Sequence, residues 1–136
     1  MKTNNNNFIN PKFLAIAGIF ALFISCGLED AGKSQCAIDV EDTLDTWQTT
    51  YNLQMTEAVD SEGNTQSLEA CLIRKGLTEE YIQSLKNRRG WMNSNGGCNG
   101  DEKSALNSRI NKRVQELEED MESTWNRCEE VYGSGG

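Results

Sequence analysis

The chain has 136 residues, with 13 lysines and arginines, 21 aspartates and glutamates, and no histidine. Lys2 and Lys12 precede residue 26 and every acidic residue follows it, so residues 26–136 carry a net charge of −10. An acidic surface of this kind disfavours nucleic acid and anionic lipid headgroups as partners. Because histidine is the commonest general base and completes most nucleophilic dyads, its absence predicts a protein that is not an enzyme.

The chain begins with a segment that is typical of an export signal. Residues 13–24 form an apolar run that follows Lys2 and Lys12. Twelve residues are too few to span a bilayer, which takes about 20 residues in a helix. The run therefore fits the hydrophobic region of a signal peptide.

Residues 22–26 read Leu-Phe-Ile-Ser-Cys, and Glu29 and Asp30 follow. The first motif resembles the lipobox of bacterial lipoproteins, and the acidic pair is similar to the surface-export signals of some Bacteroidota lipoproteins. The resemblance implies that Cys26 carries diacylglycerol and an acyl chain such as palmitate. It also implies anchoring to a bacterial membrane, most simply the outer membrane. We expect a signal peptide over 1–25, a lipid-attached tether over 26–34, a helical domain over 35–132 and a flexible tail over 133–136.

Ordinary secretion is the alternative to lipid anchoring. Small residues at Ser25 and Gly27 fit cleavage after Gly27, which would release an unlipidated protein of a eukaryote. Both interpretations require export of the domain.

The number of cysteines is consistent with export. With Cys26 assigned to the lipid, Cys36, Cys71, Cys98 and Cys128 remain. An even set of cysteines in an exported protein predicts disulfides, and four cysteines allow three pairings. A zinc site made of all four thiolates is the alternative, and we expect no metal and no cofactor.

Three helices are predicted in the exported part. The first carries an apolar stripe from Ala37 to Ala58 and ends near Val59, before the turn at 60–64. The second begins near Leu68. Gly76 is predicted to cap its first half and Thr78 to begin its second half, so this helix is kinked or split.

Residues 90–100 are predicted to form a loop, because glycine and asparagine dominate its second half. Asp101 is predicted to be the N-cap of the third helix. The stripe of this helix continues at helical spacing from Leu106 through Trp125 and Cys128 to Val131.

These elements predict an all-α fold, a three-helix up-down-up bundle stapled by disulfides. In this topology Cys36 and Cys98 share one end, and Cys71 and Cys128 share the other. The sequence therefore predicts the disulfides Cys36–Cys98 and Cys71–Cys128. A Cys36–Cys128 bond would have to span about 36 Å, the length of about 24 helical residues. The same packing places the acidic start of the first helix beside the basic turns of the third. It also places Arg74 and Lys75 near the acidic turns of the third helix.

The best candidate for a binding site is the group Arg88, Arg89, Trp91 and Met92, since tryptophan and arginine are common hot-spot residues. The alternative is that Trp91 folds back over the end of the bundle while the arginines complement the helix C-terminus. Trp47 and Trp125 lie on apolar stripes and are predicted to be core residues.

We therefore expect a lipid-anchored, non-enzymatic envelope protein. It would bind an unidentified macromolecular partner or act as a surface component. An immunity or inhibitor lipoprotein that blocks a basic toxin or enzyme is a second possibility, and a secreted eukaryotic helical ligand is a third.

Overall fold

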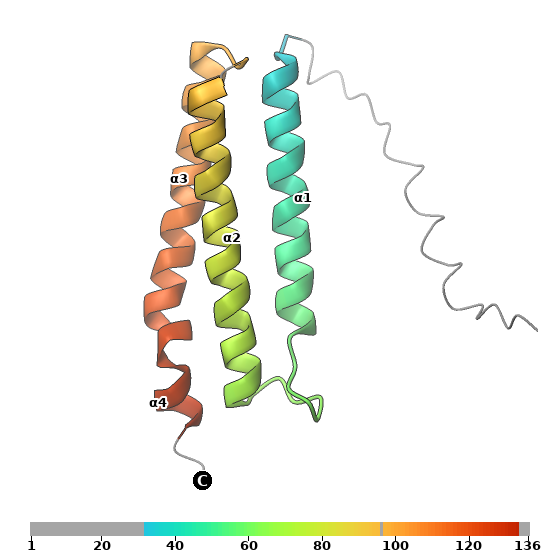
Figure 1. Cartoon of the computed structure of the whole chain (residues 1–136), viewed down its shortest axis with the longest axis vertical. Helices are drawn as coiled ribbons and strands as arrows, with labels where there is room; N and C mark the ends of the chain where they lie inside the picture. The colour runs from blue at the N-terminus through green and yellow to red at the C-terminus, as the bar shows by residue number, and fades with distance from the viewer. Residues whose placement is uncertain (1–31, 96, 134–136) are drawn as a thin grey trace, which may run out of the picture. The chain divides into compact units, whose positions relative to one another are not determined.

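The computed structural model describes residues 32–95 and 97–133. Cys26, the signal segment and residues 134–136 lie outside this part. The described residues are mainly helical and contain no strand. The helices are α1 (Gln35–Glu57), α2 (Leu68–Asn95), α3 (Gly100–Ser123), the short 3₁₀ helix η3 (Trp125–Arg127) and α4 (Cys128–Tyr132) (Figure 1). The all-α prediction is confirmed.

Side-chain contacts join the three long helices to one another. Thr43 contacts Arg88, and Tyr51, further along α1, contacts Thr78, earlier on α2. Lys86 of α2 likewise pairs with Glu118 of α3. An ion pair between Arg109 and Asp45 joins α3 to α1. This pair is a contact of the predicted kind, between the basic turns of the third helix and the acidic residues of the first.

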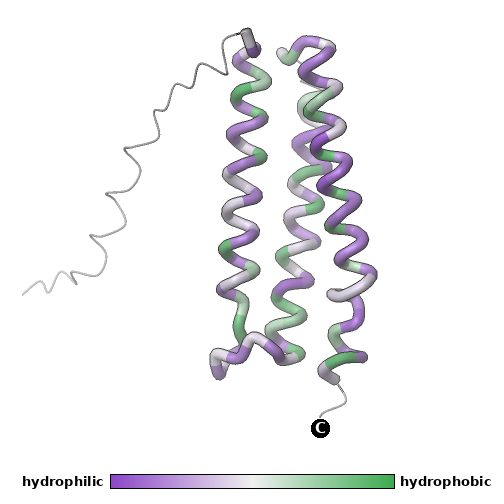
Figure 2. Tube along the Cα trace, turned by 180° about the vertical axis from the view of Figure 1, so that it is seen from behind, coloured by the Kyte–Doolittle hydropathy of each residue, from purple (hydrophilic) through white to green (hydrophobic). Residues whose placement is uncertain are grey.

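The core runs along the axis of the bundle. All three long helices contribute buried apolar side chains at helical spacing. Hydrophobic and hydrophilic residues alternate along each of these helices (Figure 2). The buried set is Ala37, Val40, Leu44, Tyr51, Tyr81, Ile82, Leu85, Met92, Leu106, Ile110, Val114, Leu117 and Met121. Trp47 and Trp125 are partly buried against this core, as the stripes predict.

Helix α2 is one element over Leu68–Asn95, so the predicted split at Gly76 is wrong. A glycine inside a helix costs only about 1 kcal/mol relative to alanine, which packing on both sides outweighs. Thr78 is not an N-cap: it is fully buried, and its hydroxyl donates to the carbonyl of Arg74 at 2.9 Å. The hydroxyl of Tyr51 lies 3.0 Å from that of Thr78 and satisfies it within the core. A bend in α2 remains a prediction.

The segment predicted as a loop over 90–100 is helical as far as Asn95, so the loop is much shorter. The N-cap of α3 is Asn99 and not Asp101. The Asn99 side chain accepts from the backbone N–H of Glu102 at 2.9 Å, and the Glu102 carboxylate accepts from the backbone of Asn99 at 3.2 Å. This reciprocal capping box fixes the start of the helix.

The apolar stripe of the third predicted helix is interrupted at its end. α3 stops at Ser123, and η3 and α4 follow as separate short helices, so the stripe does not continue to Val131, which is exposed. At the start of α2, Leu72 and Ile73 are also exposed, whereas Cys71 is buried. Consecutive helical residues lie about 100° apart, so three in a row cannot all face one core.

Two disulfides join the helices, and they are the predicted pairs. Cys36 at the start of α1 bonds Cys98 in the α2–α3 connection, with Cα atoms 4.9 Å apart. Cys71 of α2 bonds Cys128 of α4, with Cα atoms 5.7 Å apart. The second bond attaches the short α4 to the body of the bundle.

Arg74 holds the connection between α1 and α2. Its guanidinium donates to three backbone carbonyls: Met55 at 3.2 Å, Ala58 at 2.8 Å and Thr65 at 2.7 Å. These carbonyls belong to the end of α1 and the loop, so the side chain satisfies groups that the helix end leaves unpaired. The Arg74 guanidinium therefore binds the connection between α1 and α2, and it forms no ion pair with the acidic turns of α3 among the described residues.

We expect Arg74→Met to destabilise the domain by about 2 kcal/mol, since it removes charge-assisted bonds to the three carbonyls. Arg74→Lys should recover only part of this loss, because an ammonium cannot reproduce the planar fork of donors. Urea denaturation followed by circular dichroism measures both effects. Equal stability of the Arg74→Met variant and the wild-type protein would show that solvent replaces the guanidinium without cost.

The turn after α1 is organised by Asp60. Its carboxylate accepts from the backbone N–H of Asn64 at 2.7 Å, from the Asn64 side chain at 3.1 Å and from the backbone N–H of Glu62 at 2.9 Å. The backbone bond from Asn64 is the largest cause that lowers the pKa of Asp60 from 3.8 to about 2.

A lowered pKa means that the turn favours the ionised carboxylate. Its contribution to stability should be complete above about pH 4 and disappear as the pH falls towards 2. An NMR titration of the Asp60 carboxyl carbon should give a midpoint near pH 2, and the amide signals of Glu62 and Asn64 should move with it. A midpoint close to 3.8 would mean that the turn does not hold the carboxylate.

Candidate functional site

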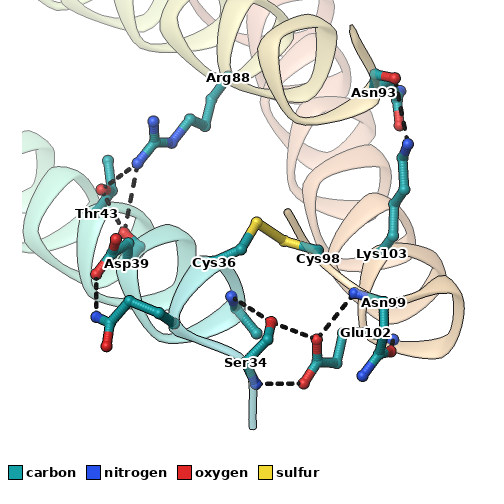
Figure 3. Close-up of a disulfide and its surroundings, with 12 residues drawn as sticks. Ser34, Cys36, Asp39, Thr43, Arg88, Asn93, Cys98, Asn99, Glu102 and Lys103 are labelled. Carbon is teal, nitrogen blue, oxygen red and sulfur yellow. Dashed lines mark hydrogen bonds between the residues drawn. A yellow bond between two sulfur atoms is a disulfide. The ribbon is translucent and has the colours of Figure 1, made fainter. Parts of the chain in front are cut away.

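Arg88 links α2 to α1 near one end of the bundle. Its Nη2 donates to the hydroxyl of Thr43 at 2.7 Å and approaches the carbonyl of Asp39 at 3.4 Å (Figure 3). The Nε atom is buried and has no acceptor among the described residues. The guanidinium is therefore held against α1 and does not extend freely into solvent.

Trp91 lies on the same face of α2, three residues after Arg88. The guanidinium carbon of Arg88 sits 4.7 Å from the centroid of the Trp91 ring, which is the geometry of a cation–π contact. The tryptophan remains 44% exposed. Helix α2 therefore presents the partly exposed ring of Trp91, and the hydrogen bond to Thr43 holds the neighbouring Arg88 in place. We call these two residues the Arg88–Trp91 pair.

The other two predicted residues point elsewhere. Arg89 hydrogen-bonds the side chain of Asn111 on α3. Met92 is completely buried and belongs to the hydrophobic core, so it is not available to a partner. The helical assignment of 90–95 explains the error: Met92 follows Leu85 by seven residues, or about two turns, and both therefore face the core.

The start of the helical domain lies at the same end of the bundle. The Ser34 side chain caps α1 by accepting from the N–H of Ala37 at 3.2 Å. The Ser34 hydroxyl donates to Glu102 at 2.6 Å and its backbone N–H donates to the same carboxylate at 2.8 Å (Figure 3). The hydroxyl bond, followed by the backbone bond, lowers the pKa of Glu102. One carboxylate therefore serves the N-termini of both α1 and α3.

These contacts place the Arg88–Trp91 pair near the point where the chain enters the domain. Arg88 contacts Asp39 and Thr43, which lie one to two turns after Cys36 on α1. The Cys36–Cys98 disulfide fixes the same end covalently. The sequence suggested Arg88 and Trp91 as candidates, but it gave no signal for Thr43, the residue of α1 that Arg88 contacts.

Neither a metal centre nor a membrane span is found among residues 32–95 and 97–133. That part of the chain brings together no group of three or more metal-ligating side chains. Its helices are too polar or too short to cross a membrane. The proposed lipid acceptor Cys26 lies outside the described residues.

No known protein family matches the chain, and neither curated proteins nor solved structures gave a similar protein.

Proposed function

We propose that this chain is an exported lipoprotein whose helical domain is anchored through diacylglycerol on Cys26 and binds a macromolecular partner. The lipobox-like residues 22–26 support the anchor. The four remaining cysteines form two disulfides, which are compatible with a location outside the cytoplasm. An up-down-up bundle with a bend in α2 would serve as the scaffold, and no catalytic role is proposed.

The observation that carries the binding proposal is the exposed ring of Trp91 on a rigid helix, with the guanidinium of Arg88 stacked against it. Immobilising a free side chain on binding costs about 0.5–1.5 kcal/mol. Trp91 has already lost part of that freedom, and tryptophan and arginine are the residue types that dominate interface energetics. The pair is therefore the best-prepared contact surface among the predicted site residues.

The tether would set where this surface meets its partner. Eight residue steps separate Cys26 from Ser34, and a fully extended chain covers at most about 29 Å over that distance. Because the Arg88–Trp91 pair lies at the Ser34 end of the bundle, it would stay close to the membrane surface. The partner we propose is accordingly an envelope protein exposed at that surface.

Site-specific photo-crosslinking in intact cells tests this proposal. A photoreactive residue at position 91 should give a discrete crosslinked species, whereas one at Leu53, which is 56% exposed on α1, should not. Trp91→Ala should weaken binding of the crosslinked partner by about 30-fold, as expected for a hot-spot residue. Equal crosslinking from both positions, or unchanged affinity of Trp91→Ala, would contradict the proposal.

A further inference from the structure

A cleft of about 210 Å³ opens between α1 and α3, and neither Arg88 nor Trp91 lines it. Its apolar lining comes from the buried core residues Leu44, Leu85 and Ile110, together with Tyr81 of α2. Its polar lining consists of Gln48, Arg109, Lys112, Arg113 and Glu116. We call this feature the α1–α3 cleft.

The charge of the α1–α3 cleft is opposite to that of the domain around it. Three cations and one carboxylate line it, and Asp45 pairs with the lining residue Arg109, which leaves a local excess of one positive charge. Residues 26–136 as a whole carry a net charge of −10. Cations above an apolar floor act in a medium of lowered dielectric constant, which strengthens their attraction for an anion.

The protein positions Arg113 firmly. Its guanidinium carbon lies 5.9 Å from the ring centroid of Tyr51 and 5.8 Å from that of Tyr81, and the two rings are themselves stacked at 4.7 Å. Nη1 contacts Glu116 at 3.2 Å, whereas Nε is buried without an acceptor among the described residues. The donors of this guanidinium are therefore only partly used.

The two other cations differ in how they are held. Arg109 forms an ion pair with Asp45, which fixes it across the mouth between α3 and α1. Lys112 is exposed and takes part in no ion pair or hydrogen bond with the described part of the chain. An anion in the cleft would thus meet two guanidinium groups that each already pair with one carboxylate, and one ammonium that pairs with none in the described part of the chain.

We propose that the α1–α3 cleft binds a small oxyanion, namely a phosphate or carboxylate group. Guanidinium groups recognise such oxygens through paired, charge-assisted hydrogen bonds. The volume is below the roughly 300–1,000 Å³ of sites that enclose drug-sized ligands, so the cleft suits a small acid or the charged end of a larger molecule. This inference is independent of the lipid anchor and of the Arg88–Trp91 pair.

An NMR titration of the full chain with inorganic phosphate tests the proposal, with chloride added at matched ionic strength as the control. Phosphate should produce saturable shifts of the Arg109 and Arg113 Nε–H signals that chloride does not reproduce. Lys112→Gln and Arg109→Gln should each weaken phosphate binding at least about threefold. Arg127→Gln removes the same charge from an exposed pair with Glu130 on the distant end of the chain and should leave binding unchanged.

A parallel titration with acetate distinguishes the two oxyanions, and tighter binding of either one supports the site. Lys112→Gln removes an exposed side chain that makes no ion pair with the described residues, so it should fold normally and keep the test decisive. Identical chemical-shift changes in chloride and phosphate would mean that the cleft attracts anions only as general counterions, which would contradict the proposal. Equal phosphate affinity of the Lys112, Arg109 and Arg127 variants would also overturn the proposal.

Discussion

Reducing both disulfides is expected to unfold the helical domain. The Cys36–Cys98 and Cys71–Cys128 bonds join residues that are 62 and 57 positions apart. In the chain-entropy model, closing loops of this length contributes about 4 kcal/mol for each bond. Two such contributions, about 8 kcal/mol, are comparable to the whole stability of a typical domain, which is about 5–15 kcal/mol.

Paired substitutions separate the two contributions. Replacing Cys71 and Cys128 with alanine should lower the free energy of unfolding by about 4 kcal/mol, and replacing Cys36 and Cys98 should do about the same. Circular dichroism during urea denaturation, with and without reductant, measures these losses. Peptide mapping under non-reducing conditions checks the pairing. A Cys36–Cys71 or Cys36–Cys128 peptide, or an unchanged midpoint after verified reduction, would contradict this account.

Met92→Ala is expected to destabilise the domain by about 2–5 kcal/mol, the usual cost of truncating a fully buried large side chain. The neighbouring substitution Trp91→Ala should cost about 1 kcal/mol or less, since much of the ring is exposed and its contact with Arg88 is of the cation–π kind. Adjacent residues thus provide a matched comparison: one variant should lose stability and the other should lose binding.

Thermal and urea denaturation of the two variants measure this difference. If Met92→Ala were as stable as wild type and lost the partner instead, residues 90–95 would form the flexible binding loop that glycine and asparagine first suggest, and helix α2 would end earlier. If both variants were equally destabilised, Trp91 would be part of the core and the proposed contact surface would be withdrawn.

The fold was predictable because its strongest signals are long and redundant. The stripe from Leu106 to Met121 spans more than four turns, and every member of it at helical spacing is buried. The cysteine pairs followed from the same periodicity, since helix lengths determine which cysteines share an end. An apolar stripe that extends over many turns still predicts the helix when its boundaries are wrong by one or two residues.

Local signals were less reliable because packing overrides them. Gly76 and Thr78 have the residue types of a helix end and a helix start, yet both lie inside α2. Thr78 is accommodated by Tyr51, a partner 27 residues away that no local pattern reveals. Met92 was misplaced for a related reason: a run of glycine and asparagine after it obscured its seven-residue spacing from Leu85.

The candidate sites show the same division. Arg88 and Trp91 could be chosen from residue type alone, although the sequence placed Trp91 in a loop and not on helix α2. The α1–α3 cleft could not be predicted from the sequence. Arg109, Lys112 and Arg113 look like ordinary surface residues of a helix, and only the folded structure places α1 and Tyr81 beside them. The packing of the helices decides which cations line a cleft, and this packing depends on residues throughout the core.

The mass of the mature N-terminus tests the central claim most directly. The protein should be purified from the envelope of its native cell and its N-terminal peptide analysed by mass spectrometry. The lipoprotein account predicts a chain that begins at Cys26 and carries a diacylglycerol group, with or without an additional acyl chain. An unmodified Cys26 in a chain that still begins at Met1, or a chain that begins at Leu28 after cleavage behind Gly27, would contradict it.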